Sequence, residues 1–204
     1  MLSRLFPQNG ESVPRLRFAG FDNVWKSVKI GDIATVSMCK RIFKEQTTPN
    51  GEIPFYKIGT FGGAADSYIS RQLFEEYKNK YPYPHKGDVL ISASGSIGRT
   101  VVYNGDDEYF QDSNIVWLNH DESITNDFLK HLYDIIEWSG IEGSTIKRLY
   151  NDNILNTIIK IPEILEQDII SKTLDVIDSE ISNTEIVLMS LYKLKNGMLN
   201  NLFI

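Results

Sequence analysis

Residues 163–203 read EILEQDIISKTLDVIDSEISNTEIVLMSLYKLKNGMLNNLF, and this stretch decides how the C-terminal part of the chain folds. Its contact positions recur at alternating spacings of four and three, and only Thr184 and Lys195 among them are polar. This is the heptad pattern of a helix that packs along another helix. The alternative is a long helix that packs along its own domain. Such a helix would be roughly 60 Å long, however, which is too long to pack on a small domain over its whole length. We therefore predict a coiled-coil helix over residues 161–204, with a contact line of Ile170, Leu174, Ile177, Ile181, Leu188, Leu191, Met198 and Leu202.

Upstream of Pro162 the chain changes character, and short apolar runs alternate with turns. Runs of this length and composition predict strands. A cap at Thr125 or Asn126 predicts a helix over 125–136, and a shorter helix is expected over 70–77. Asn104-Gly105 lies between two apolar runs and predicts a hairpin turn. We expect an α+β domain with a mainly antiparallel sheet over residues 14–160, preceded by a junction over 1–13. The predicted strands cover residues 53–58, 88–92, 100–103 and 114–118.

The composition is that of a water-soluble globular protein. Hydrophobic residues make up 42% and charged residues 24% of the 204 positions, and no apolar run approaches the ~20 residues of a membrane span. The first residues turn polar too quickly for a secretory signal. Cys39 is the single cysteine, which excludes an internal disulfide and a multi-cysteine zinc site. We expect a cytoplasmic chain without a membrane partner.

The net charge of −6 argues at first against a nucleic-acid partner, but the charges are segregated. Residues 36–100 carry nine basic and six acidic side chains, whereas residues 101–140 carry nine acidic groups and one lysine. The C-terminal stretch 161–204 is also acidic, with seven acidic and three basic residues. A basic surface for DNA is therefore compatible with the acidic whole, and the acidic blocks are candidates for protein contacts.

The motifs of common cofactor and metal sites are missing from the sequence. There is no phosphate-binding loop, dinucleotide fingerprint or nucleophile elbow, so no cofactor and no catalytic residue is predicted. His85, His120 and His131 are scattered without metal-ligand spacing, so we predict no metal site.

One arrangement superficially resembles a metal-dependent nuclease. Asp66, Glu76 and Lys78 have the residue types that hold Mg²⁺ and support an attacking water. Glu76 and Lys78 fall in a predicted helix, however, and a solvated helix face is the simpler interpretation.

Loops of the basic region are better candidates for binding. The stretch Cys39-Lys-Arg41 to Lys44 suits contact with phosphates, Gly59-Thr-Phe-Gly-Gly63 allows close backbone approach, and residues 92–99 combine hydroxyls with a guanidinium. Ordinary turns with solvated lysines are the alternative for each loop. The candidate DNA-binding residues are Lys40, Arg41, Lys44, Lys57, Thr60, Ser94, Ser96, Arg99, Lys147 and Arg148.

Taken in order, several segments resemble the DNA-specificity subunit of type I restriction–modification systems. They are Pro14-Arg-Leu-Arg-Phe-Ala-Gly-Phe21 before Trp25, Lys29-Ile-Gly-Asp-Ile33, Ile53-Pro-Phe-Tyr56, Lys86-Gly-Asp-Val-Leu-Ile-Ser-Ala-Ser-Gly-Ser-Ile-Gly98, Ile159-Lys-Ile-Pro162 with Glu166-Gln167, and the close at 191–203. Family members usually contain two repeats, each a target recognition domain followed by a long helix. This chain has one, so it resembles a half-subunit or a fragment. Met1-Leu-Ser-Arg-Leu-Phe-Pro7 matches residues 198–204 at four of seven positions, as expected at a junction between repeats.

The resemblance implies a non-catalytic subunit that binds one half of a bipartite site on double-stranded DNA. It implies that the helix pairs antiparallel with a second half-subunit, or with a missing repeat, and so sets the half-site spacing. Adenine methyltransferase subunits and a restriction motor subunit would be the further partners and would carry the catalysis. A metal-dependent DNA-cleaving enzyme and a protein-only coiled-coil adaptor are the alternatives.

Overall fold

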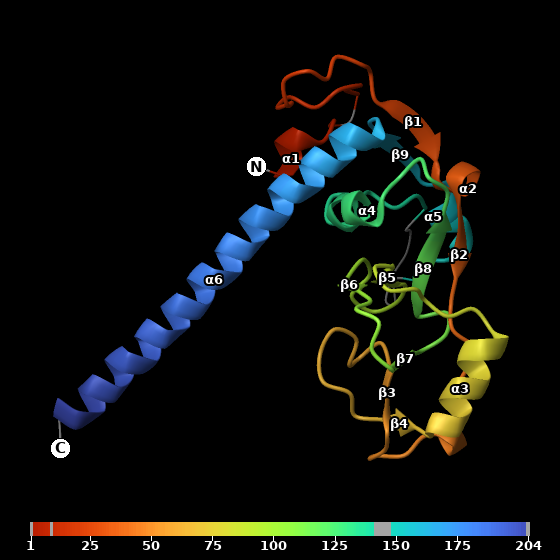
Figure 1. Cartoon of the computed structure of the whole chain (residues 1–204), viewed down its shortest axis with the longest axis vertical. Helices are drawn as coiled ribbons and strands as arrows, with labels where there is room; N and C mark the ends of the chain where they lie inside the picture. Colours follow the sequence, from red (N-terminus) through yellow and green to blue (C-terminus); the bar gives the residue numbers. More distant parts are fainter. Residues whose placement is uncertain (1, 9, 141–147, 203–204) are drawn as a thin grey trace.

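The structure is a computed structural model that describes residues 2–8, 10–140 and 148–202 (Figure 1). Its elements are α1 (Leu2–Leu5), β1 (Lys26–Lys29), α2 (Ile30–Ile33), β2 (Ala34–Ser37), the 3₁₀ turn η1 (Lys44–Gln46), β3 (Ile53–Tyr56), β4 (Tyr68–Ile69), α3 (Arg71–Lys80), β5 (Val89–Ser92), β6 (Thr100–Val102), β7 (Tyr109–Phe110), β8 (Ile115–His120), α4 (Asn126–Tyr133), α5 (Asn151–Asn156), β9 (Ile158–Ile161) and α6 (Ile164–Leu202).

Antiparallel pairing dominates the sheets. A four-stranded sheet has the order β2-β8-β5-β6, β1 pairs with β9, and β3 lies between β4 and β7. The pairing of β3 with β7 is parallel, and the other pairings among the described strands are antiparallel. The predicted α+β class with a mainly antiparallel sheet followed by a long helix is therefore confirmed.

The two central strands of the four-stranded sheet, β5 and β8, are buried on both faces. Side chains alternate between the faces of a strand, so Val89 and Ile91 of β5 enter one core cluster while Leu90 enters the other. In β8, Leu118 lies on the side of α4, and Trp117 lies on the side of β3, β7 and α3. This double burial explains the nearly continuous apolar runs that identified both strands in the sequence.

Both shorter predicted helices form and begin at capping side chains. Ser70 accepts a hydrogen bond from the amide of Leu73 at the start of α3, and Thr125 accepts one from the amide of Phe128 at the start of α4. The predicted hairpin at Asn104-Gly105 is wrong, because β6 before it pairs with β5 whereas β7 after it pairs with β3. The local turn signal could not show which strands the two runs would join.

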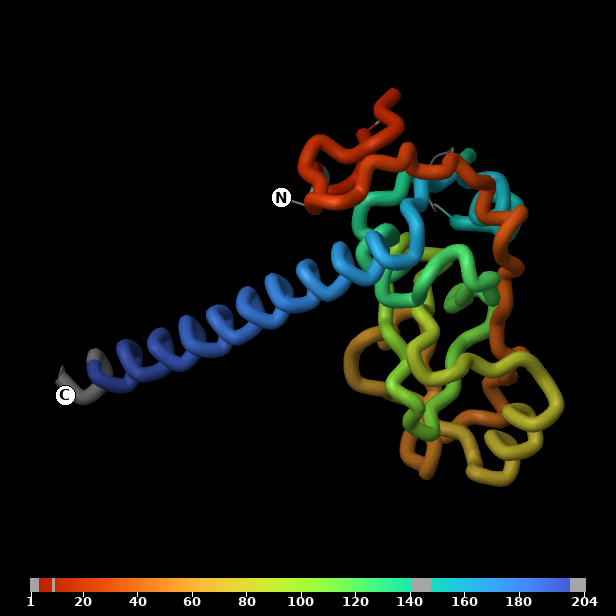
Figure 2. The backbone as a smooth tube through the Cα atoms, turned by 45° about the horizontal axis from the view of Figure 1, so that its top comes forward, coloured from red at the N-terminus to blue at the C-terminus, as the bar shows by residue number. Residues whose placement is uncertain are grey.

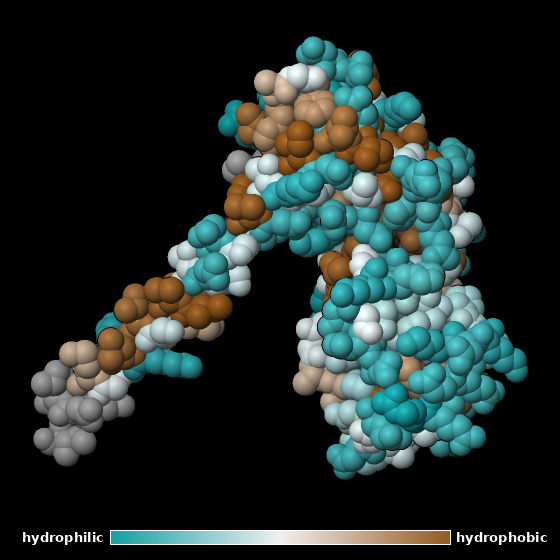
Figure 3. Space-filling view, viewed as in Figure 1, coloured by the Kyte–Doolittle hydropathy of each residue, from teal (hydrophilic) through white to brown (hydrophobic). Residues whose placement is uncertain are grey.

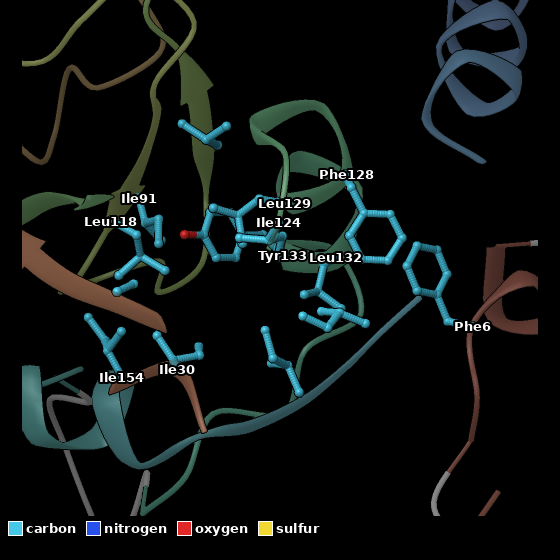
Figure 4. Packing of buried hydrophobic residues seen from close by; sticks show 14 of the residues in the cluster. Phe6, Ile30, Ile91, Leu118, Ile124, Phe128, Leu129, Leu132, Tyr133 and Ile154 are labelled. Atoms are coloured by element: carbon cyan, nitrogen blue, oxygen red, sulfur yellow. The ribbon is translucent and has the colours of Figure 1, made fainter. Parts of the chain in front are cut away.

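The first core cluster joins the N-terminal segment, α4 and the base of α6 (Figure 4). Phe6 lies 5.4 Å from the ring of Phe128 and 6.0 Å from that of Trp25, measured between ring centroids. Leu5 and Phe6 are both buried, so part of the stretch 1–13, expected as a junction, packs inside this core.

The base of α6 is anchored to the domain. Ile170 and Leu174 are buried in the first core cluster, so these two positions of the predicted contact line pack within the chain itself. Gln167 is also buried and bonds to three backbone groups: its Oε1 accepts from the amide of Thr125, and its Nε2 donates to the carbonyls of Ser123 and Pro162. These contacts set the direction in which the helix leaves the domain.

Beyond its base, α6 extends away from the globular part (Figures 1 and 2). Four positions of the predicted contact line, Ile181, Leu188, Leu191 and Met198, are each between 50% and 57% exposed. Ile177 is half-buried, and the side chain of Leu202 lies outside the described part of the chain. None of the helices in the described residues combines the length and apolar character needed to cross a membrane.

Candidate nucleic-acid interface

Four consecutive residues between β7 and β8, Gln111-Asp112-Ser113-Asn114, connect several loops of the basic region. The side-chain Oε1 of Gln111 accepts a hydrogen bond from the backbone amide of Ile58 at 2.9 Å. The backbone amide of Gln111 donates to the carbonyl of Tyr56, also at 2.9 Å. This pairing fixes the loop after β3 against the start of β8. We call residues 111–114 the hub turn.

The other three residues of the hub turn each hold one predicted DNA-binding residue. Arg41 Nε donates to Asp112 Oδ2 at 2.7 Å. Arg148 Nη2 donates to Ser113 Oγ at 3.0 Å, and Ser94 Oγ donates to Asn114 Oδ1 at 2.9 Å. Side chains that are more than a hundred residues apart in the sequence therefore meet at one turn.

The backbone of the hub turn is strained at Ser113. Its φ is 45°, in the left-handed region, where a side chain costs roughly 1–2 kcal/mol. Among the described non-glycine residues it is the one with a positive φ. Strain of this kind persists where surrounding contacts hold it, as the bond from Arg148 does here, and it is common at binding sites.

The glycine-containing loop 92–99 lies beside the hub turn and is folded around a buried hydroxyl. Ser92 Oγ donates to the carbonyl of Ser96 and accepts from the amide of Arg99. Gly95 and Gly98 adopt φ values of 67° and 84°, which allow the tight turn at both ends. The loop consequently presents Ser96 and Arg99 at the surface.

Arg99 and Arg148 are the cations of this surface with neutral partners. Arg99 Nη2 donates to the carbonyl of Ile58 at 2.8 Å, and its guanidinium lies 5.6 Å from the centre of the Phe61 ring. Arg148 lies at the same distance from the ring of Tyr150. Within the described stretches no carboxylate lies within 4.0 Å of either guanidinium. Their positive charge is therefore available to an anion such as a phosphate.

Lys57 and Thr60 belong to the same region, but Lys57 is already paired. Its Nζ lies 2.8 Å from Asp66, and both side chains are partly exposed. Thr60 Oγ1 accepts from the amide of Lys57 and so closes the turn after β3. A phosphate would have to compete with Asp66 for this lysine.

The remaining predicted residues are not brought to the hub turn. Lys40 lies over the ring of Tyr81, at 5.0 Å, beside the end of α3. Lys44 begins η1 and is exposed. Lys147 lies outside the described residues.

The residues of the nuclease alternative are not assembled into a site. Asp66 pairs with Lys57, whereas Lys78 Nζ lies 3.5 Å from Asp107 and over the ring of Phe74. Glu76 is exposed on α3. The arrangement therefore has the form of a solvated helix face.

The acidic block 101–140 does not form a single acidic face. Asp112 pairs with Arg41 inside the candidate interface, and Asp107 pairs with Arg71 at 2.8 Å, which lowers the pKa of Asp107. Asp112 belongs to this acidic block but lies within the candidate interface, where it is paired with Arg41.

Sequence reasoning overlooked Gln111, Ser113 and Asn114 as parts of the site. Asp112-Ser113-Asn114 is a cluster of turn-forming residues between two apolar runs, a signal that could have marked a turn here. Its partners could not be read from the sequence, because Arg41, Ser94 and Arg148 are all distant along the chain.

Comparison with known proteins gives consistent matches over most of the chain. Residues 23–188 match the family described as type I restriction modification DNA specificity domain. A protein of Haemophilus influenzae, described as a type I restriction enzyme specificity subunit, is 54% identical over 162 residues, which are 79% of this chain and 42% of that protein.

Solved structures share the fold. A chain from a type I restriction–modification system, studied for complex assembly and conformational transition, matches with a TM-score of 0.67 at 20% identity, over 91% of this chain and 44% of that one. The HsdS subunit of Thermoanaerobacter tengcongensis matches with a TM-score of 0.58 at 19% identity, over 89% and 42%. The S subunit of M. genitalium gives 0.56 at 18%, over 83% and 43%. This chain spans less than half the length of each of these relatives.

Proposed function

This chain belongs to the type I restriction–modification DNA specificity family, and we propose that it recognises one half of a bipartite site on double-stranded DNA. The observation that carries the proposal is the surface around the hub turn. There Arg148 bonds to Ser113, and Arg99 of the neighbouring loop bonds to the carbonyl of Ile58, so both have neutral partners and lie near exposed hydroxyl and amide groups. Arginines with neutral partners suit phosphate oxygens, and hydroxyl and amide groups suit base edges.

We propose further that α6 is the assembly element. Figure 3 shows hydrophobic side chains gathered on the outer part of this helix. Exposed apolar side chains in a continuous group mark a surface that binds another protein, and the heptad spacing suits a second long helix. An antiparallel pair would place a second recognition domain at the far end of α6. Since 39 residues of helix are about 58 Å long, the pair would act as a spacer between two half-sites.

Methyltransferase subunits and a restriction motor subunit are the proposed further partners, and they would supply the chemistry. In this proposal the chain itself only positions them on DNA, so it is non-catalytic. A homodimer of this chain and a pairing with a second repeat of the same parent protein are both compatible with the exposed helix. They differ in the DNA sequence that they would recognise.

The salt dependence of DNA binding tests the recognition surface. We would combine Arg99→Gln with Arg148→Gln in the full chain, assembled with its methyltransferase, and measure the affinity for duplex DNA by fluorescence anisotropy over a range of salt concentrations. Each lost phosphate contact lowers the slope of log affinity against log salt by about 0.9. We therefore expect the slope to fall by about 2 in the double variant. Arg15→Gln is the matched control, since Arg15 is an exposed arginine that pairs with Glu11 outside the proposed interface.

Two results would count against this function. If the double variant keeps wild-type thermal stability and its slope of log affinity against log salt is unchanged, the surface around the hub turn does not contact DNA phosphates. Absence of binding to any duplex at low salt by the wild-type assembly would favour the protein-only adaptor. Sequencing methylated adenines in cells that carry the assembly distinguishes the pairing modes, because a homodimer reads an interrupted palindrome and a two-repeat parent reads two different halves.

A further inference from the structure

A buried histidine lies at the junction between α4 and α6, outside the candidate interface. His131 is on α4 and its side chain is only 1% exposed. Asp175 and Asp178 lie three residues apart on α6, hence on one face of that helix. One ligand atom from each of the three residues lies within 4.8 Å of the other two. The junction therefore gathers an imidazole and two carboxylates.

The two ring nitrogens have different environments. Nε2 lies 3.0 Å from Asp175 Oδ1, which is also 2.8 Å from Nζ of Lys130. Nδ1 is buried and has no hydrogen-bond partner, and the nearest carboxylate oxygen, Oδ2 of Asp178, is 3.9 Å away. When the neutral ring donates Nε2–H to Asp175, Nδ1 presents a lone pair toward Asp178. Two electron-pair donors then face each other with a gap between them.

The gap is slightly wider than the spacing of two zinc ligands. A distance of 3.9 Å is too long for a hydrogen bond, whereas two ligands at about 2.0–2.2 Å from a tetrahedral ion lie about 3.3–3.6 Å apart, so a small rotation of the half-exposed Asp178 side chain brings both atoms within reach of one ion. A histidine that binds a metal commonly gives its other N–H to a carboxylate, as His131 does to Asp175. Asp178 is 55% exposed, so water can complete the coordination.

We propose that His131 Nδ1 and the carboxylate of Asp178 bind a divalent transition-metal ion of the zinc class, with Asp175 orienting the imidazole. A mixed imidazole and carboxylate site suits zinc, whereas magnesium prefers oxygen ligands alone. The ion ties α4 to α6 just where the helix begins to leave the domain. It reinforces the direction that the hydrogen bonds of Gln167 already give to α6.

Calorimetry on the tag-free full chain tests this site without DNA. After treatment with a chelator, we expect the wild type to bind one equivalent of Zn²⁺, Mg²⁺ to produce no binding heat, and zinc to raise Tm by several degrees. Nitrogen-15 NMR reports directly on His131, because zinc at Nδ1 shifts that nitrogen and leaves His85 and His120 unaffected.

Two variants separate the site from general zinc affinity. Asp178→Asn removes one ligand at a half-exposed position, so it folds and should weaken zinc binding by at least about tenfold. Glu185→Gln is the matched control, since Glu185 occurs one heptad later on α6 and is exposed. Equal zinc affinity of the Asp178→Asn variant and the wild type would overturn the proposal. So would a His131 Nδ1 resonance that does not respond to zinc.

Discussion

The ion pair between Arg17 and Glu166 gives the sharpest test of how α6 is held to the domain. Arg17 Nε and Nη2 donate to the two carboxylate oxygens of Glu166, each at 2.8 Å, and Nη2 also donates to the carbonyl of Asn23. The side chain of Glu166 is 1% exposed and that of Arg17 is 16% exposed. Replacing Arg17 by alanine leaves a buried carboxylate in the first turn of α6 without its cation.

The expected loss follows from that burial. Removing one partner of a buried, doubly bonded ion pair lowers the free energy of unfolding by about 3–5 kcal/mol. We expect the lower end, about 3 kcal/mol, because Arg17 is partly exposed and water can enter the vacated space. In a chain of 204 residues each kcal/mol corresponds to roughly 2–4 °C. Arg17→Ala should therefore lower Tm by roughly 6–12 °C.

Differential scanning calorimetry measures this shift, and the chain offers a matched control. Arg15 lies two residues away and also forms a 2.7 Å ion pair, with Glu11, but this pair is exposed. Arg15→Ala should leave Tm nearly unchanged, because exposed ion pairs contribute little to stability. The double variant Arg17→Ala/Glu166→Ala should be less destabilised than the sum of the single variants. If Arg17→Ala and Arg15→Ala shift Tm equally, the anchoring role assigned to the buried pair is wrong.

Three further perturbations have defined outcomes. Leu188→Glu places a charge on the exposed contact line of α6 and should convert an associated species into monomer in sedimentation velocity, whereas Ser179→Glu should leave the association intact. Gln167→Leu leaves three backbone groups without their hydrogen-bond partner and should lower the free energy of unfolding by about 3 kcal/mol. A midpoint of urea unfolding equal to that of the wild type would contradict this expectation. Burial raises the pKa of the Cys39 thiol from 9.0 to about 12, so at pH 8 native Cys39 should react with iodoacetamide about a thousandfold more slowly than in denaturant. This raised pKa favours the folded state below pH 9, and the stabilisation is lost as the pH rises toward 12; equal alkylation rates would show that the thiol is not buried.

Elements that depend on local pattern could be predicted from the sequence. The heptad spacing predicted α6, because a helix of that periodicity presents one apolar line whatever its surroundings. Thr125, one of two capping candidates, proved to be the cap of α4, because a cap needs only a hydroxyl at the right offset. The order of short motifs predicted the family, and the family comparison confirmed that prediction.

Which distant side chains meet depends on the tertiary fold and could not be predicted from the sequence. The heptad line does not reveal that Ile170 and Leu174 pack inward while Leu188 remains exposed, because that division depends on where the domain surface ends. The hub turn joins Arg41 with Arg148, and the α4–α6 junction joins His131 with the two aspartates of α6, across separations that no spacing rule covers. A sequence pattern records periodicity along one element, whereas a site is a coincidence of several elements in space. Both proposed sites therefore became visible only when the chain had folded.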